Sequence, residues 1–515
     1  MDLASITATI GSVIVSLGWA VGLAMLVLAV MYVQDVFQKQ HSVRRNFPVI
    51  GRLRYALERQ GEFLRQYFFA GDRQEMPFNR ATRSWIYRSA KGLGGTIGFG
   101  STNDLREPGS LIFVNAAFPV LEEERAPTPP LAIGEGYCKE PFLGRSVMNV
   151  SAMSYGAASA PAVQALSRGA ALAGCWLNTG EGGLSPQHLE GGCDLIFQIG
   201  TAKYGVRDLH GEFSPVRARE LGAQVKAFEV KLSQGAKPGK GGILPGAKVT
   251  SEIASIRGIS EGEDSVSPNR HTDIADIDQL LDFVSRLREL SGRPVGVKTA
   301  IGGEQFVDEL IEAVLRRGPE AAPDFLTIDG GEGGSGAAPQ ALADHMGLPL
   351  AEALPLVASR LITARLMPRI RLIASGKLVT SARAAWALCV GADFVNTARG
   401  FMLALGCIQS LKCHTNECPT GITTHNKRLQ RGLVVGEKYL RAASYCRSMN
   451  AEIDMIAHSC GLTHARELRR KHARIVQTAG RSVPLDELYP YPRDAPPPHE
   501  AAPAAGAGRK TARGG

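Results

Sequence analysis

The 515-residue sequence lacks several features that mark common functional classes. It has no stripe of basic residues interleaved with aromatics, although its formal net charge is +9, so nucleic acid is not expected as a partner. No charged residue occurs between Asp2 and Asp35, and no basic residue precedes the apolar run in between. A secretory signal peptide has a short apolar core after basic residues, so this pattern argues against one.

The apolar run is longer than the roughly 20 residues that span a bilayer, and it predicts a transmembrane helix over residues 5–33. Lys39, Arg44 and Arg45 follow it, so the positive-inside rule places the C-terminal body in the cytoplasm. The predicted location is the cell inner membrane, with a single pass; a buried core helix is the alternative interpretation. In a cytoplasmic body, the nine cysteines are expected to be thiols or metal ligands rather than disulfides.

The rest of the chain divides into three regions by composition. Residues 36–140 form an N-terminal region with helical patterning, expected to pack on the main domain, which spans residues 145–480. Residues 484–515 are rich in Pro, Ala and Gly and are predicted to be a disordered tail.

Short apolar runs alternate with helical patterns throughout the main domain. Continuous apolar runs are typical of buried parallel strands, and eight of them predict an α/β fold, the (β/α)8 TIM barrel. An open doubly wound sheet competes, but no GxGxxG-type turn follows the first strand. The strand candidates are SVMNVSAM, CWLNTGEGG, DLIFQIG, KAFEVKL, PVGVKTAIG, DFLTIDGG, IRLIASGK and DFVNTARG.

Polar and glycine-rich segments follow these strands, at the end of a barrel where ligands bind. The glycine-rich turns after the sixth and seventh strands are typical of phosphate binding, although glycine also marks tight turns. Lys231 and Lys298 each end an apolar strand, where a lysine can stabilise an anionic flavin or bind a carboxylate. Glu181 is a candidate acid or base, or a member of a polar network. These residues predict flavin mononucleotide (FMN) and an acidic substrate.

Three cysteines, Cys407, Cys413 and Cys418, form a C-x5-C-x4-C pattern with a proline after the last. Zinc sites pair cysteines two to four residues apart and need a fourth ligand, which this segment does not offer plainly. Three irregularly spaced thiols before a proline favour an iron–sulfur cluster, with three irons favoured over four. Buried core thiols are the alternative.

Five long motifs in this region resemble those of a known enzyme family: SAMSYGAAS, NTGEGG, KLSQGAKPGKGGILPGAKV, IDGGEGGSGAAP and GCIQSLKCHTNECPTGITT. From about residue 145 to 430 the chain resembles the FMN- and iron–sulfur-binding synthase domain of glutamate synthase. The resemblance implies a barrel that holds FMN and a 3Fe-4S cluster. It also implies reduction of 2-iminoglutarate, formed from 2-oxoglutarate and ammonia, to L-glutamate. Cys407, Cys413 and Cys418 match the family's three cluster ligands.

The resemblance also implies roles for individual residues. Glu181 and Lys231 match residues that line the 2-oxoglutarate site, and Gln234 and Lys237 lie in the same motif. The predicted catalytic residues are Glu181, Lys231 and Lys237, and the predicted substrate contacts are Lys231, Gln234 and Lys237. The residues that look like flavin-ring, ribityl and phosphate contacts are Met153, Ser154, Thr179, Gln198, Lys298, Gly330, Gly331, Gly334, Ser335, Gly376, Lys377, Thr397 and Ala398.

The chain departs from the larger members of that family in several places. No cysteine precedes Cys138 and a membrane helix stands where a glutaminase domain would begin, so no glutaminase is expected. The seventh strand ends in Ala-Ser-Gly where the family has Asp-Gly-Gly, and Thr420 replaces an aliphatic residue in the cysteine loop. The chain therefore looks like the short stand-alone form, some members of which are subunits of N-methylglutamate synthase.

Three interpretations remain open from the sequence. The leading one is a glutamate-forming oxidoreductase that uses ammonia and takes electrons from a ferredoxin-like protein or another subunit. The second is an FMN-dependent oxidoreductase acting on another acid or on methylamine. The third is a membrane-tethered electron-transfer subunit. A homo-oligomer is left open.

Overall fold

The computed structural model describes residues 3–492 and divides the chain into two units, residues 1–82 and 83–515. The boundary falls within helix α4 (Arg80–Ala90). The greater part of the predicted disordered tail, residues 493–515, lies outside the described residues.

The first unit is helical, as predicted. It contains α1 (Leu3–Phe37), α2 (Ser42–Asn46), α3 (Gly51–Leu64) and the π-helical turn η1 (Arg65–Phe69). Residues Ile10–Phe37 are long and apolar enough to cross a membrane, and none of the most apolar stretch is buried. The transmembrane span remains a prediction, because length and composition alone support it.

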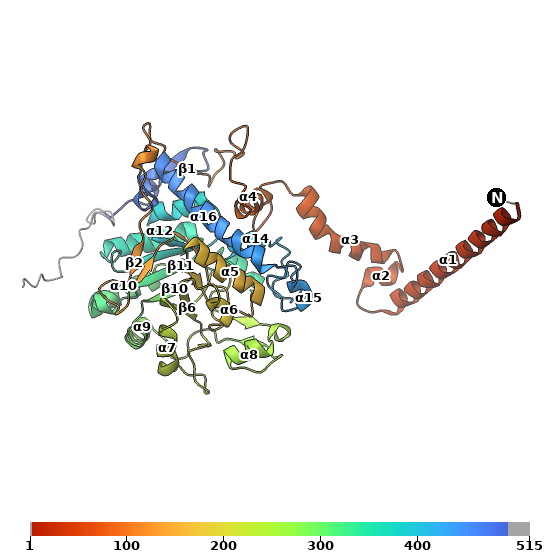
Figure 1. Ribbon diagram of the computed structural model, residues 1–515, viewed down its shortest axis with the longest axis horizontal. Helices are drawn as coiled ribbons and strands as arrows, with labels where there is room; N and C mark the ends of the chain where they lie inside the picture. The colour runs from red at the N-terminus through yellow and green to blue at the C-terminus, as the bar shows by residue number, and fades with distance from the viewer. Residues whose placement is uncertain (1–2, 493–515) are drawn as a thin grey trace, which may run out of the picture. The chain divides into compact units, whose positions relative to one another are not determined.

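The second unit is built on a closed barrel of eight parallel strands, which confirms the predicted fold (Figure 1). Each predicted run contains one barrel strand, and the strands pair in chain order, the last with the first. They are β4 (Met148–Val150), β5 (Leu177–Asn178), β6 (Leu195–Ile199), β7 (Ala227–Lys231), β10 (Val295–Thr299), β11 (Phe325–Asp329), β12 (Arg371–Ser375) and β13 (Phe394–Thr397).

Burial on both faces explains why the barrel strands appear in the sequence as continuous apolar runs rather than as alternating apolar and polar residues. All five residues of β7 and all five of β10 are buried, because one face lines the barrel and the other lies under the helices. An apolar cluster fills the end where the strands begin and includes Ala227, Phe325 and Phe394. The hairpin of β2 (Leu131–Ile133) and β3 (Phe142–Gly144) contributes Ile133 and Phe142 to this cluster. The chemistry is therefore left to the opposite end.

Helices cover the outside of the barrel, and local signals set their ends. Ser159 caps α5 by accepting a hydrogen bond from the Ala162 amide, and Gly174 ends it in the left-handed conformation. The longer covering helices are α5 (Ala160–Ala173), α7 (Pro215–Gly222), α9 (Ile277–Ser291), α10 (Gln305–Arg317), α12 (Leu350–Thr363), α13 (Ser381–Val390) and α16 (Val435–Ser459). The shorter ones are α6 (Pro186–Leu189), α8 (Ser251–Arg257), α11 (Gln340–His345), α14 (Arg399–Leu405) and α15 (Lys427–Gln430).

Besides the β2–β3 hairpin, two further small sheets lie outside the barrel, and none of the three was predicted. One orders β1 (Leu111–Phe113), β14 (Ala473–Val476) and β15 (Ser482–Pro484), and the other pairs β8 (Ile243–Leu244) with β9 (Ser265–Val266). Residues 484–492, the start of the predicted tail, are described and partly ordered. Helix α17 (Leu485–Leu488) buries Leu485, and Tyr491 stacks on Arg470.

Candidate functional site

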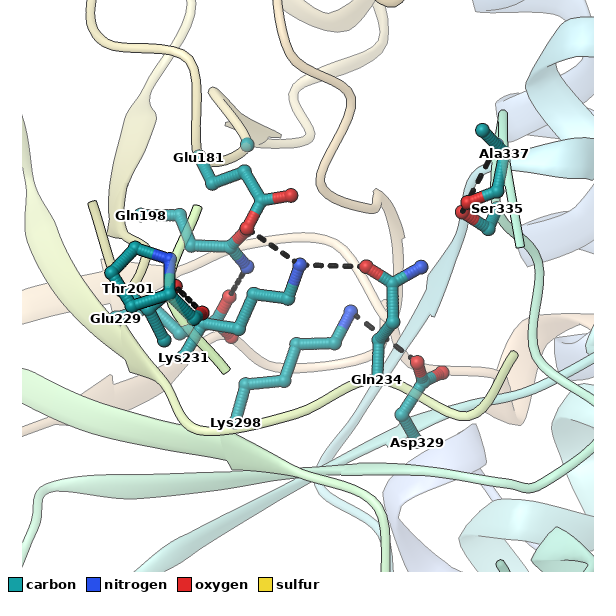
Figure 2. Close-up of polar contacts among 12 residues, drawn as sticks. Glu181, Gln198, Thr201, Glu229, Lys231, Gln234, Lys298, Asp329, Ser335 and Ala337 are labelled. Atoms are coloured by element: carbon teal, nitrogen blue, oxygen red, sulfur yellow. Dashed lines mark hydrogen bonds and ion pairs between the residues drawn. The ribbon is translucent and has the colours of Figure 1, made fainter. Parts of the chain in front are cut away.

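The predicted site residues converge at the carboxyl end of the barrel. Lys231 ends β7, Lys298 lies one residue from the end of β10, and the two pair across neighbouring strands. Figure 2 shows both side chains pointing toward the same polar cluster. Side chains at one barrel face come from several strands, so residues far apart in sequence meet here.

Glu181, Lys231 and Gln234 form one connected group (Figure 2). The ammonium of Lys231 donates to Glu181 Oε2 at 2.9 Å and to Gln234 Oε1 at 2.6 Å. Gln234 then donates through Nε2 to the carbonyl of Gly334 at 2.9 Å. The loops after β5, β7 and β11 are thereby joined through the buried Lys231 and through Gln234.

The charge around Glu181 is unbalanced. Burial raises the pKa of Glu181, but Lys231, Lys237 and Arg257 outweigh it, and the pKa falls from 4.5 to about 2. Glu181 is therefore an anion at neutral pH and cannot serve as a proton donor there. Burial lowers the pKa of Lys237, and Glu181 opposes that shift. Three cationic side chains thus surround one carboxylate, which favours a further anion.

Two glycines allow Glu181 to occupy its position. A Cβ on Gly200 would lie 2.6 Å from Cβ of Glu181, and one on Gly242 would lie 2.5 Å from Oε1. Real Cβ atoms do not approach other atoms so closely, so a side chain at Gly200 would clash with the base of the Glu181 side chain, and one at Gly242 would push the Glu181 carboxylate out of its position. Gly242 lies in the KPGKGG segment, which the sequence analysis treated only as part of a motif.

Asp329 organises the neighbouring strand ends, and the sequence analysis missed it. Its carboxylate accepts from the Gly235 amide at 2.9 Å and from the Ser375 hydroxyl at 2.8 Å, and it lies 3.7 Å from Lys298 Nζ. Burial raises the pKa of Asp329, but Lys298 and the hydrogen bonds outweigh it and lower the pKa overall. Ser375, part of the Ala-Ser-Gly departure, therefore has a structural partner.

Gln198 does not contact the lysines and points instead to a buried carboxylate inside the barrel (Figure 2). Glu229, fully buried on β7, accepts from Gln198 Nε2 at 2.6 Å, Asn178 Nδ2 at 2.8 Å and Thr327 Oγ1 at 2.6 Å. Glu229 was not predicted from the sequence either. A buried carboxylate holding three donors fixes the rotamer of each.

Two backbone N–H groups of the glycine-rich turn after β11 are hydrogen-bonded within the chain. The Gly330 amide donates to Ser375 O and the Gly331 amide to Leu348 O, each at 2.8 Å. These two N–H groups are therefore engaged within the chain. The neighbouring Ser335 hydroxyl donates to Ala337 O at 2.9 Å.

Positive charge at this side of the mouth comes from side chains instead. Arg399 donates to the carbonyl of Glu332 at 2.6 Å, and a Cβ on Gly334 would lie 2.8 Å from its Nε. Lys377 follows Gly376 directly after β12. Burial lowers the pKa of Lys377, and the positive charge of nearby Arg399 lowers it further. Arg399 is a residue that the sequence analysis quoted within TARG without assigning it a role.

The remaining predicted contacts lie at the same end of the barrel. The Met153 amide donates to Asn178 O at 3.4 Å, and Thr179 Oγ1 accepts from the Gln198 amide at 3.2 Å. A Cβ on Gly180 would lie 2.5 Å from the Ser154 amide, so the loops after β4 and β5 touch. Thr397 ends β13, and Ala398 precedes α14.

The cysteine loop follows α14. Burial raises the pKa of Cys407 to about 12, and Cys413 and Cys418 add to that rise, so the three thiols are electrostatic neighbours. The Cys418 thiol lies 3.4 Å from the Thr420 hydroxyl. Within residues 3–492, however, no three Cys, His, Asp or Glu side chains converge closely enough to hold a metal ion.

Helix α4 packs over this loop through residues of the second unit. The Tyr87 hydroxyl donates to the carbonyl of Cys407 at 2.6 Å, and the Trp85 indole donates to Glu452 on α16 at 3.3 Å. The part of α4 that belongs to the second unit therefore lies against the cysteine loop.

An eight-stranded parallel barrel whose mouth gathers lysines, arginine and glycine turns defines a ligand-binding enzyme of the (β/α)8 class. Residues 112–463 match the sequence profile described as "Conserved region in glutamate synthase". Since that match covers more than half of the chain, the protein belongs to the glutamate synthase family.

Relatives support the same assignment. The chain is 39% identical to the glutamate synthase large subunit-like protein YerD of Bacillus subtilis (strain 168), over 91% of this chain and 96% of that protein. It is 35% identical to the archaeal-type glutamate synthase [NADPH] of Thermotoga neapolitana, covering 62% of this chain and only 60% of that protein. It is 28% identical to a glutamate synthase large subunit-like protein of Rhizobium meliloti (strain 1021), over 77% of this chain and 90% of that protein.

Solved structures show only a distant likeness. Mandelate oxidase with 3,3-difluoro-2-hydroxy-3-phenylpropionic acid is 15% identical, with a TM-score of 0.41 over 77% of this chain and 97% of that one. A flavocytochrome b2 variant with benzoylformate is 13% identical, with a TM-score of 0.42 over 81% of this chain and 86% of that one. At these values the likeness carries no argument about the site.

Proposed function

We propose that the protein reduces 2-iminoglutarate, formed from 2-oxoglutarate and ammonia, to L-glutamate. The family assignment supports an oxidoreductase of this kind. The observation that carries the substrate class is the surplus of positive charge around Glu181, where Lys231, Lys237 and Arg257 all act on one carboxylate. Such a cluster suits a dicarboxylate, because each substrate carboxylate can take a charge-assisted hydrogen bond.

Lys231 is the residue that we assign to the substrate carboxylate. Its ammonium has three donors, of which Glu181 and Gln234 take two. The incoming carboxylate takes the third or displaces the Gln234 amide oxygen, while Glu181 keeps the lysine charged and oriented. Lys237, which is buried, adds a second positive charge to the same site.

The residues fit FMN in type and charge, and we infer that it is the resident cofactor. Lys298 would face the flavin ring, while Lys377 and Arg399 would hold the phosphate beside the turn of Gly376. When bound, FMN supplies hydride transfer to the imine carbon. Glu229 holds Gln198 in one rotamer, so that the amide is fixed before the ring arrives.

The three thiols fit a 3Fe-4S cluster by residue type. Cys407, Cys413 and Cys418 would hold it, and a cluster supplies one-electron transfer. We further propose a ferredoxin-like protein or another subunit as electron donor. Helix α1 would anchor the enzyme in the cell inner membrane with its body in the cytoplasm.

The test uses anaerobically purified full-length protein, reduced chemically and mixed with 2-oxoglutarate and one nitrogen donor at a time. Glutamate formed with ammonia supports the proposal. N-methylglutamate formed only with methylamine would replace it with the second candidate, an N-methylglutamate synthase-type reaction. Product from neither amine, with flavin present, would refute the substrate assignment.

A pair of lysine variants tests the site itself. Lys231→Gln should raise the KM for 2-oxoglutarate roughly 10–100-fold, the value of one hydrogen bond to a charged group. Lys226→Gln is the control, because Lys226 is exposed and precedes the same strand at the opposite end of the barrel. Equal KM values for both variants would exclude Lys231 from the substrate site.

A further inference from the structure

Helix α3 and the π-helical turn η1 carry an apolar face that is exposed to solvent. Leu53, Leu57 and Leu64 are 59%, 56% and 39% exposed, and Phe68 is 77% exposed. At about 100° per residue, the three leucines fall within a sector of about 40°. Tyr67 and Phe69, 57% and 76% exposed, add aromatic side chains at the end of this amphipathic segment.

The same region of the chain is strongly basic. Residues 38–66 contain seven basic and two acidic side chains, and Arg54, Arg65 and Glu62 lie away from the leucine sector. An amphipathic helix with basic residues beside a leucine and aromatic face is typical of segments that lie in a membrane interface. The excess of positive charge suits anionic headgroups rather than another basic protein surface.

A buried ionic clamp, in which Arg44 and Arg52 both pair with Asp35, fixes the start of α3 to the end of α1. The carboxylate of Asp35, fully buried near the end of α1, accepts from Arg44 at 2.6 Å, Arg52 at 2.8 Å and the Val49 amide at 3.0 Å. Arg52, in the first turn of α3, also donates to Gln34 Oε1 at 3.0 Å. The first turn of α3 is thereby held where the apolar run of α1 ends.

From that corner α3 leads away from α1 rather than back along it (Figure 1). If α1 spans a bilayer, the clamp therefore places α3 at the level of the headgroups. At that depth, the exposed apolar face of α3 can be buried against the acyl chains of the lipids.

We propose that α3 and η1 lie in the surface of the membrane that α1 spans, with the leucine and aromatic face in the acyl boundary and the arginines at anionic headgroups. This inference rests on the proposed anchor. It gives the enzyme a second membrane attachment besides α1.

The test uses full-length protein in nanodiscs of phosphatidylglycerol and phosphatidylcholine. A photoreactive benzophenone amino acid is placed at Leu53 in one protein and at Glu62 in another. The two exposed positions are nine residues apart and so about 180° apart on the helix. Lipid adducts are measured by mass spectrometry, retention by alkaline carbonate extraction, and glutamate formation on the same samples.

We expect roughly tenfold more lipid adduct from position 53 than from position 62, in protein that resists extraction. Equal lipid labelling at both positions would overturn the proposal, as would adducts from position 53 to the barrel or to a second copy of the chain. Release of the protein from the membrane by alkaline carbonate would also overturn the proposal, because it would show that α1 does not anchor the protein. Glutamate formation is measured on the same samples, so a failure of the proposed function can be distinguished from a failure of the proposed membrane contact.

Discussion

Replacing Lys231 with methionine should leave the Glu181 carboxylate short of its closest positive charge. The two groups lie 2.9 Å apart, and the Glu181 side chain is only 20% exposed. The pKa of Glu181 falls from 4.5 to about 2, which corresponds to about 3 kcal/mol in favour of the charged form. Lys237 and Arg257 share this stabilisation, so about 1–3 kcal/mol belongs to the Lys231 contact.

The sign of the pH dependence follows from the lowered pKa. The stabilisation is fully present above the ordinary glutamate pKa of 4.5 and is lost as the pH falls toward about 2. In Lys231→Met, burial still raises the pKa of Glu181 while one opposing cation is gone. The pKa of Glu181 is therefore depressed less in this variant, so the stability difference between wild type and variant should be largest above pH 4.5 and should shrink as the pH falls toward about 2.

A double-mutant cycle measures the contact. Thermal unfolding at pH 7.5 of the wild type, Lys231→Met, Glu181→Gln and the double variant should show a coupling of about 1–3 kcal/mol, because the double variant no longer buries an unpaired charge. Lys226→Met, an exposed lysine, should change stability by less than about 0.5 kcal/mol. Effects of the two single substitutions that add to within about 0.5 kcal/mol would refute the reasoning.

Three further predictions follow from the site. Glu229→Gln replaces a buried carboxylate that accepts three hydrogen bonds with a neutral amide that has only one acceptor oxygen. It should therefore cost about 1–3 kcal/mol and shift the visible spectrum of bound flavin, whereas exposed Glu220→Gln should do neither. Cys413→Ser should lose protein-bound iron by colorimetric analysis while Cys193→Ser retains it; full iron in Cys413→Ser would remove that cysteine from the ligand set. Gly242→Ala places a Cβ 2.5 Å from Glu181 Oε1 and should raise the KM for 2-oxoglutarate several-fold. Gly436→Ala is the control and should leave the KM unchanged, because no atom lies within 4 Å of the added Cβ. Equal KM values in the two variants would show that substrate binding does not depend on the position of Glu181.

The barrel could be predicted because its strands are buried on both faces. KAFEVKL and PVGVKTAIG read as continuous apolar runs, and β7 and β10 are buried at every position. The small sheets could not be predicted in the same way. β8 and β9 have two residues each, too few to show any periodicity.

The site was predictable only in part. Lys231 and Lys298 stand out because a lysine interrupts an apolar strand, and Glu181 stands out within a glycine-rich turn. Glu229 is a charge inside an apolar run too, but its role depends on Asn178, Gln198 and Thr327, which come from three other strands. Asp329 and Arg257 act through partners up to about a hundred residues away, and no local pattern reveals such contacts.

The most direct test of the central claim is a single anaerobic turnover. Chemically reduced full-length enzyme is mixed with 2-oxoglutarate and ammonia, and flavin absorbance and glutamate are followed together. The proposed function predicts that the flavin reoxidises and that glutamate forms in step with it. A flavin that stays reduced in the presence of both compounds, with no glutamate formed, would contradict it.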